Sequence, residues 1–332
     1  MQRGLPRIAI VNDIAGVAEV QVRLLRAAGY EVDFLALPML GAAWGPRAKA
    51  ACLPLRLLMY LPVAARLRRR DYDVVHVHFA SQGIVAMGSG KPLVIHAHGS
   101  DLHLNLHRPL VWWITQRVLR RASHIFYVTP NLRSYLAGFE SRAELLGNPI
   151  ETHLFEGAEP PAQVRRALVF ARLEEIKGVG EIFANAREIG SEVHLAALDW
   201  GPGAASYRER DGQFVEFLPA VAHDEVPSLL DGFDIVIGQM HLGVPGLCEL
   251  EAMARCRPVI MRLEKSLYPM EPPPVVHVET GADIAAAVRM LRDSPETARR
   301  IGVAGQEWVK RHHSPDQTLA ALKHTYEELR QH

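Results

Sequence analysis

The sequence is poor in cysteine and contains no long apolar run. Its three cysteines, Cys52, Cys248 and Cys256, lie far apart and match neither a metal-ligand spacing nor a disulfide framework. No run of about 18 apolar residues predicts a membrane-spanning helix. The first residues lead directly into the apolar segment 7–11, without the apolar region of a signal peptide. We therefore expect a reducing, cytoplasmic setting.

Two common nucleotide-binding motifs are also missing. The segment 12–18, after the first apolar run, has one glycine where the dinucleotide fingerprint needs three, and no GxxxxGK[ST] loop occurs. This disfavours a Rossmann dehydrogenase and a P-loop enzyme. The sixteen histidines are scattered and lack carboxylate or cysteine partners at the spacing of a known site, so we expect no metal ion.

Short apolar segments alternate with helix-compatible segments along the chain. Such alternation is typical of βαβ units with mostly parallel, doubly wound sheets. With 332 residues, two domains of roughly 150 residues each are expected. The segments predicted as strands are 7–12, 31–37, 74–78, 92–97 and 123–128 in the first half, and 166–170, 192–197, 213–218, 234–238 and 257–261 in the second.

The two halves differ in charge and are separated by the turn-rich segment 157–162. Residues 1–157 carry 18 Lys and Arg against 11 Asp and Glu, whereas residues 158–332 carry 19 against 26. We predict an N-terminal domain over 1–157, a C-terminal domain over 158–313, and a last helix over 314–332 that packs back onto the first domain. The basic half is suited to an anionic membrane or acceptor, or is simply a solvated surface.

Two segments of the second half carry residues suited to an anionic ligand. Arg172 and Lys177 lie in the loop after the predicted strand 166–170, where an Arg fork and a Lys point charge together suit a diphosphate. The segment 241–254 is glycine-rich and then helical, so its first amides point at a ligand. Glu251, about one turn into that helix, is placed to accept hydrogen bonds from a ribose diol. Glu249 faces elsewhere and is read as a helix-start carboxylate.

These segments, taken in order, resemble glycosyltransferase family 4, whose members have the GT-B fold. The resemblance covers nearly the whole chain. It lies in the segments GVAE (16–19), DVVHVH (73–78), HAHGSD (96–101), GNPIE (147–151), Arg172 to Gly178 and EAMA (251–254). It implies an α/β protein of two facing, doubly wound, Rossmann-like domains with a cleft between them.

The resemblance also implies residue roles. Arg172 and Lys177 would hold the donor diphosphate and stabilise the leaving group, and Glu251 would bind the donor ribose. His98 would line the site near the transferred sugar. Further donor contacts would come from Gly16 and Val17 in the first domain and from the backbone of Gly246, Leu247 and Cys248 in the second.

One position departs from the family pattern Glu-x7-Glu. Counting back from Glu251, the first carboxylate is replaced by Gly243. We expect the sugar to be recognised differently, through His241 or Gln239, or donor use to be impaired. Asp101 is expected to orient His98, to contact acceptor, or to cap the following helix.

Other features have a plain structural interpretation. His76, His78 and His96 are read as hydrogen-bonded packing residues. The segment 53–70 reads as a basic amphipathic helix, which either packs on its own sheet or contacts anionic lipid. The pair Trp112 and Trp113 is expected in the core or in the wall of the cleft.

The favoured function is a retaining, metal-independent glycosyltransferase that moves a sugar from a nucleotide-diphosphate sugar to a glycan, lipid-linked or secondary-metabolite acceptor. It would need no cofactor and no nucleic acid partner, and could contact the membrane peripherally. The alternatives are a nucleotide-sugar epimerase and a nucleotide-sugar-binding subunit or sensor without turnover.

Overall fold

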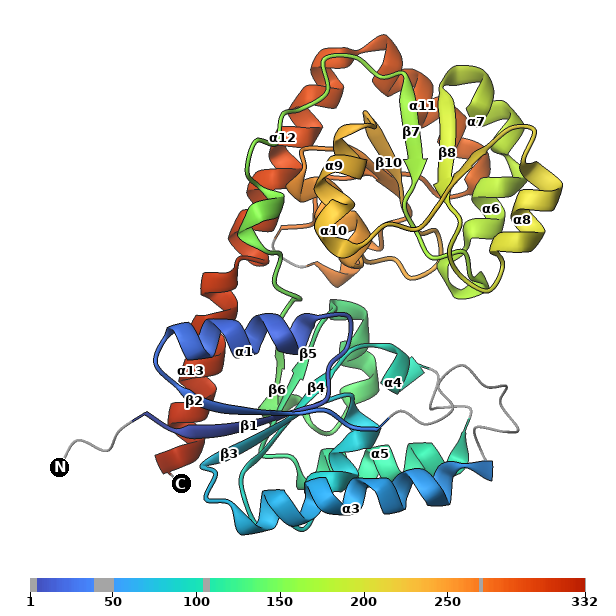
Figure 1. Ribbon diagram of the computed structural model, residues 1–332. Helices are drawn as coiled ribbons and strands as arrows, with labels where there is room; N and C mark the ends of the chain where they lie inside the picture. The colour runs from blue at the N-terminus through green and yellow to red at the C-terminus, as the bar shows by residue number, and fades with distance from the viewer. Residues whose placement is uncertain (1–4, 39–50, 104–107, 269–270, 332) are drawn as a thin grey trace. The chain divides into compact units, whose positions relative to one another are not determined.

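Alternating strands and helices build two compact units, seen in the computed structural model of Figure 1. The structure describes residues 5–38, 51–103, 108–268 and 271–331. The first unit comprises Met1–Pro149 together with Pro315–His332, and the second comprises Ile150–Ser314. Within the described ranges, no helix is both long enough and apolar enough to cross a membrane.

The first unit is built on a six-stranded parallel sheet with the strand order β2-β1-β3-β4-β5-β6. The central strands are apolar and buried, as is typical of a sheet covered on both faces. The strands are β1 Arg7–Val11, β2 Glu31–Leu35, β3 Val74–His78, β4 Leu93–Ala97, β5 His124–Tyr127 and β6 Ala143–Leu145. The helices are α1 Val17–Ala27, α3 Leu53–Arg69, α4 Ser100–His103, α5 Pro109–Arg121 and α13 Pro315–Gln331.

Helices cover both faces of this sheet. α1 and α13 lie over one face, and α3 and α5 lie over the other (Figure 1). Leu322 and Tyr326 of α13 are fully buried in the same core as Leu25 of α1. The C-terminal helix is therefore an integral layer of the first unit.

The second unit has the same architecture, with the strand order β12-β11-β10-β7-β8-β9 and all pairs parallel. Apolar cores fill both faces of its sheet. The strands are β7 Arg166–Val169, β8 His194–Leu198, β9 Glu216–Leu218, β10 Ile235–Ile237, β11 Val259–Met261 and β12 Val276–His277. The helices are α6 Val179–Ala184, α7 Ala186–Glu192, α8 Ala204–Asp211, α9 Val226–Asp231, α10 Leu247–Ala254, α11 Ile284–Asp293 and α12 Pro295–His312.

In each sheet the chain order reverses beside the first strand. The reversal lies between β1 and β3 in the first unit and between β7 and β10 in the second. Open α/β sheets bind ligands outside the carboxyl ends of their strands at such a switch point. The loops that follow β7 and β10 are therefore the first place to look for a ligand site in the second unit.

The first unit ends earlier than the turn-rich segment 157–162 indicates. Ile150 and Leu154 are buried in a core of the second unit, and Arg255 donates hydrogen bonds to the carbonyls of Leu154 and Glu156. These contacts attach residues 150–156 to the second unit. The prediction of strands missed β6 and β12, which are edge strands of three and two residues. Segments this short show no periodicity.

Candidate functional site

The loop after β7 carries the two predicted cations. Arg172 is exposed, and its Nη1 lies 3.9 Å from Oε2 of Glu174. Lys177 ends the short 3-10 helix η6 (Glu175–Lys177), and its carbonyl accepts the N–H of Met240 at 2.8 Å. This backbone bond joins the loop after β7 to the loop after β10, so both loops meet at the switch point of the sheet.

The N-terminus of α10 is held by the carboxylate of Glu249. One oxygen accepts the N–H of Gly246 at 2.8 Å, and the other accepts the N–H of Gln239 at 2.9 Å. Glu249 is buried, and a Cβ on Gly238 would lie 2.7 Å from its side chain, so a larger residue there would displace the carboxylate. The interpretation of Glu249 as a helix-start carboxylate agrees with these contacts.

The Lys177 ammonium reaches this helix terminus. Its Nζ lies 3.8 Å from the position that a Cβ on Gly246 would take. The first N–H groups of a helix have no intrahelical acceptor, and the helix dipole adds partial positive charge there. Glu249 already accepts the Gly246 N–H, so of the predicted donor residues Leu247 and Cys248 are those whose helix-start amides can share a positive region with Lys177. This arrangement suits phosphate oxygens.

Glu251 is buried on α10 and is paired with a residue that the sequence did not suggest. Its Oε1 lies 3.0 Å from Nε2 of His223, and this contact raises the pKa of His223. His223 begins the 3-10 helix η7 (His223–Glu225), in a polar segment without a recognisable motif. A carboxylate held in this way has a second oxygen for a further donor.

Gly243 adopts a left-handed backbone with φ +70°. A Cβ at this position would lie 2.8 Å from Cβ of Glu264, and the Gly243 carbonyl accepts the N–H of Glu264 at 2.8 Å. A larger residue would need both an unfavourable φ and movement of Glu264. The glycine is therefore a requirement of this loop, and no carboxylate can take its place without rearrangement.

The two residues proposed to compensate for Gly243 have different environments. His241 packs over Gly178, where a Cβ would lie 2.5 Å from its ring, and its Nε2 lies 3.0 Å from Oε1 of Glu181. Gln239 is buried, and its Nε2 donates to the carbonyl of Val244. Among the residues that the structure describes, the Oε1 of Gln239 has no hydrogen-bond partner. Gln239 is thus the residue with an unused acceptor.

Cys248 is not activated for nucleophilic chemistry. Burial raises the pKa of its thiol well above the ordinary value, and the neighbouring carboxylates Glu249 and Glu251 raise it further. The thiolate is the reactive form of cysteine, so this side chain stays neutral. Its expected contribution is its backbone N–H.

The β1–α1 loop of the first unit is closed by Asp13. Its carboxylate accepts the N–H groups of Gly16 at 2.7 Å, Ala18 at 2.8 Å and Glu19 at 3.3 Å, and the N–H of Val17 donates to the Ile14 carbonyl. The predicted donor residues Gly16 and Val17 thus already have acceptors for their amides. A phosphate would bind these amides only after the loop changes its hydrogen bonds.

Asp101 fixes the loop that carries His98. Its carboxylate accepts the N–H groups of Ala80 at 2.7 Å, His98 at 3.0 Å and Gly99 at 2.9 Å. Asp101 is fully buried, and burial raises its pKa to about 6 despite these bonds. This geometry favours positioning of His98 over contact with an acceptor.

His76, His78, His96 and His98 form one stack on the first sheet. Neighbouring rings lie 4.7–5.3 Å apart with interplanar angles of 8–29°. Ligand nitrogens of the first three lie within 4.8 Å of one another. A zinc ion would need imidazole nitrogens aimed at one point about 2.0–2.1 Å away. Nearly parallel rings that lie side by side do not aim their nitrogens at one point, so this arrangement suits hydrogen bonding among them.

Trp113 is not in the core, which is one of the two locations expected for it. Its side chain is 56% exposed on α5, and the Arg117 guanidinium lies 5.8 Å from the ring centroid. Trp112 is half-buried. The pair alternates in exposure because adjacent residues of a helix point about 100° apart.

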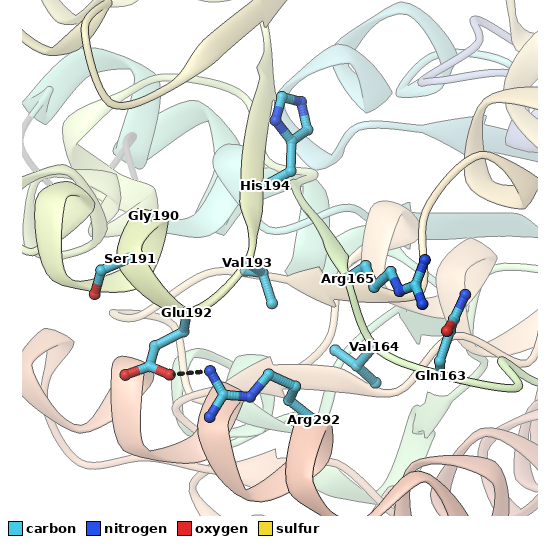
Figure 2. Close-up of a pocket in the computed structure, with 9 residues that line it drawn as sticks. All are labelled: Gln163, Val164, Arg165, Gly190, Ser191, Glu192, Val193, His194 and Arg292. Carbon is cyan, nitrogen blue, oxygen red and sulfur yellow. Dashed lines mark hydrogen bonds and ion pairs between the residues drawn. The ribbon is translucent and has the colours of Figure 1, made fainter.

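A separate hollow of about 540 Å³ opens in the second unit (Figure 2). It lies where β7 and β8 begin, between Arg165, His194 and the Glu192–Arg292 ion pair. This is the amino end of the strands, opposite the loops described above. Because ligands of such sheets bind at the carboxyl ends, the hollow is not part of the candidate donor site.

Comparison with solved structures identifies the fold. The chain is similar to sucrose-phosphate synthase from Thermosynechococcus elongatus, with 17% identity over 98% of this chain and 99% of that one, and a TM-score of 0.76. It is similar to Anabaena HepE in complex with UDP-glucose, with 14% identity over 97% and 100% of the chains and a TM-score of 0.74. Staphylococcus aureus TarM, in complex with fondaparinux, α-GlcNAc-glycerol and UDP, matches with 15% identity over 82% and 59% of the chains and a TM-score of 0.66. The fold is GT-B, as the sequence predicted.

The family comparison agrees with this fold. Residues 17–154 match the sequence model of Glycosyltransferase Family 4. The predicted resemblance to this family is therefore confirmed. A search of the curated proteins by sequence finds no match.

Proposed function

We propose that the protein is a glycosyltransferase that takes a sugar from a nucleotide-diphosphate sugar. The observation that carries the proposal is the position of the Lys177 ammonium at the N-terminus of α10, at the switch point between β7 and β10. The family match and the solved complexes of HepE and TarM with UDP or UDP-glucose support it. The acceptor is proposed to be a glycan, a lipid-linked sugar or a secondary metabolite.

The proposed chemistry follows from where negative charge develops. When the sugar–phosphate bond breaks, charge accumulates on the leaving diphosphate. Arg172, Lys177 and the first amides of α10 would stabilise that charge, so they lower the barrier without needing a metal ion for this purpose. Glu251 would bind the ribose, and His98 would contact the transferred sugar. Retention of the anomeric configuration is proposed from the family resemblance.

Recognition of the sugar is proposed to involve Gln239. The carboxylate common at position 243 in the family is absent here, and the loop geometry requires glycine. Gln239 has a buried oxygen without a partner in the described part of the chain, whereas His241 is paired with Glu181. A sugar hydroxyl that donates to Gln239 would satisfy this oxygen.

A thermal-shift panel of nucleoside diphosphates and nucleotide-sugars tests the donor site. A ligand that binds the native state raises the apparent melting temperature. We expect one diphosphate to stabilise the wild type, and Arg172→Ala to remove most of that stabilisation. Arg187→Ala, an exposed arginine on α7, is the matched control and should behave as the wild type. If no nucleotide stabilises the wild type, the proposed donor site is wrong.

Turnover separates a transferase from a sensor. With the base identified, donor hydrolysis or transfer is measured with a panel of acceptors, and Lys177→Ala is expected to lower kcat strongly. Binding that depends on Arg172 without any hydrolysis or transfer would support the sensor instead. Interconversion of the sugar without its release would support the epimerase.

We further propose that the first unit contacts anionic lipid through α3. Leu67 of this helix is fully buried, whereas Leu55, Leu58 and Leu61 are 50–61% exposed. The helix therefore has exposed apolar residues in addition to those that pack on the sheet, and it ends in several arginines. Trp113 and Leu110 of α5 are similarly exposed. Apolar contacts combined with basic charge suit an anionic bilayer surface.

Vesicle sedimentation tests this contact. The full-length chain should sediment with vesicles that contain phosphatidylglycerol and remain in solution with phosphatidylcholine alone. Leu58→Glu should lower binding at least severalfold, because it removes apolar area and adds a like charge to the lipid. Met290→Glu, at an exposed apolar position of α11 in the second unit, is the control. Equal sedimentation with both vesicle types would contradict the proposal.

A further inference from the structure

The strand register builds a ladder of four histidines on one face of the first sheet. His76 and His78 alternate along β3, and His96 and His98 alternate at the end of β4. Alternate residues of a strand point to the same face, and His78 is registered opposite His96. The helices α1 and α13 cover this face. Three of the rings are fully buried, and His98 at the loop end is partly exposed.

A continuous chain of contacts links these rings to the two covering helices. The Tyr326 hydroxyl of α13 lies 2.6 Å from Nδ1 of His76, and Nε2 of His76 lies 3.3 Å from Nδ1 of His96. Gln21 of α1 bridges the next gap, with its amide 3.5 Å from Nδ1 of His96 and 3.2 Å from Nε2 of His78. Nδ1 of His78 lies 2.9 Å from Nε2 of His98, which completes the chain.

All of these rings are neutral near pH 7. Burial lowers the pKa of His76 and of His98 to about 3, and it lowers that of His78 and His96 well below the ordinary value. A neutral imidazole has one N–H donor and one bare acceptor nitrogen. Each contact in the chain therefore determines the tautomer of the ring that follows it.

The direction of proton donation along these hydrogen bonds is set at Tyr326. Burial keeps its hydroxyl protonated by raising the pKa well above the ordinary value. Within the described residues His76 is the one hydrogen-bond partner of this hydroxyl, so the O–H donates to Nδ1 of His76. His76 then carries its proton on Nε2 and donates to Nδ1 of His96.

The positions of the remaining protons follow from that of His76. Because Nδ1 of His96 is an acceptor, the Gln21 amide must present its NH2 group to it and its oxygen to His78. The two donors share one lone pair, which accounts for the long distances of 3.3 and 3.5 Å. His78 therefore donates through Nε2 to Gln21 and accepts at Nδ1 from Nε2–H of His98.

We propose that this buried chain holds His98 in the Nε2–H tautomer and leaves its Nδ1 as a bare acceptor nitrogen. Gln21, His78 and Tyr326 are positioning residues that act on His98 through their hydrogen bonds. If His98 contacts the transferred sugar, which rests on the proposed function, it does so by accepting a sugar hydroxyl at Nδ1. A donor role for His98 is excluded by this proton arrangement.

Ring-nitrogen NMR of the full-length chain labelled with 15N-histidine tests the proposal. Each signal is assigned by replacing one histidine at a time with Gln, and the spectrum is recorded near pH 7.5 without any donor. The result is therefore independent of whether the protein transfers a sugar. We expect His98 to show one tautomer, protonated at Nε2. A wild-type His98 protonated at Nδ1, or a mixture of tautomers, would overturn the proposal.

Tyr326→Phe removes the group that sets the direction. In the wild type, reversing the direction of donation would leave the buried tyrosine O–H without an acceptor, whereas the direction proposed here leaves the Nε2–H of His96 without one among the described residues. Removing the hydroxyl removes the cost of reversal, so His98 should become a mixture of both tautomers. Tyr135→Phe is the matched control, because Tyr135 also bonds a histidine of the first unit, His103 at 2.8 Å, outside the chain. It should leave His98 unchanged.

Gln21→Met interrupts the chain in the middle and provides an independent test. It should release His78 and His98 into mixed tautomers, while His76 remains bonded to Tyr326 and keeps its proton on Nε2. A His98 that stays in one tautomer in both variants, each shown by circular dichroism to be folded, would mean that the chain does not control it.

Discussion

The hydroxyl of Tyr326 lies 2.6 Å from Nδ1 of His76, although 250 positions separate them in the sequence. This contact brings the C-terminal helix α13 onto the face of the first sheet that carries the histidine ladder. Both side chains are fully buried, so the contact belongs to the core of the first unit and not to its surface. A segment at the end of the chain thus completes a core that begins with its first strand.

Acid should destabilise the first unit from about pH 6.5 downwards. His76, His78 and His96 are neutral in the folded state because burial lowers their pKa, whereas the unfolded chain protonates them near pH 6.5. The unfolded state then binds more protons, and each ring lowers the free energy of unfolding by about 1.4 kcal/mol per pH unit. Urea denaturation between pH 7.5 and 5.0 measures this slope.

One group opposes that effect. The pKa of Asp101 is raised to about 6, so the folded state binds its proton first, and stability contributed by this carboxyl grows as pH falls from about 6 to 3.8. His76→Gln should reduce the slope by the contribution of one ring, about 1.4 kcal/mol per pH unit. His324→Gln, at a site where the side chain is 71% exposed, should not change it. A slope that is the same in all three proteins would contradict the burial of neutral histidines.

Removing the Glu249 carboxylate should destabilise the second unit. Glu249→Ala leaves the buried N–H of Gln239 and the partly buried N–H of Gly246 without this acceptor, which costs about 1–3 kcal/mol for the buried group and less for the other. Chemical denaturation gives the loss of unfolding free energy. The control is Glu225→Ala, where an exposed carboxylate accepts the N–H of Ala222 at 3.0 Å and water can replace it. Similar losses of unfolding free energy in both variants would show that burial of the N–H groups does not determine the cost.

Substitution of Gly243 should be more harmful than its backbone angle alone predicts. Gly243→Ala and Gly90→Ala both place a side chain at φ near +70°, which costs about 1–2 kcal/mol. A Cβ on Gly90 meets nothing within 4 Å, whereas on Gly243 it lies 2.8 Å from Cβ of Glu264. We therefore expect a larger fall in melting temperature for Gly243→Ala. Equal falls would mean that Glu264 moves away at no cost.

Glu251 should discriminate between ribose and deoxyribose. A hydrogen bond from a ribose hydroxyl to a charged group contributes about 1.5–3 kcal/mol, or roughly tenfold or more in affinity. For whichever nucleoside diphosphate binds, we expect Glu251→Gln to reduce the preference for the ribose form, as measured by calorimetric titration with both forms. His223→Ala removes the protein partner of Glu251 and should keep the preference. Unchanged preference in Glu251→Gln would show that the ribose binds elsewhere.

Much of the architecture was predictable because it is encoded locally. Each of the ten predicted strands has a counterpart in the structure, since apolar segments bounded by turns are readable one at a time. The missed strands β6 and β12 are too short to show periodicity. The exposure of Trp113 was not readable from the sequence, because an aromatic pair on a helix does not reveal which member faces the sheet.

The sequence alone determined the doubly wound fold class, the resemblance to family 4 and the candidate cations, because strand alternation and short ordered motifs depend only on neighbouring residues. The tertiary structure decided which side chains meet. It paired Glu251 with His223, gave Asp13 the amides of the β1–α1 loop, and joined Tyr326 and Gln21 to the histidine ladder. These contacts arise from strand register and from the packing of helices distant in the sequence. Neither can be predicted from the spacing of residues within one segment.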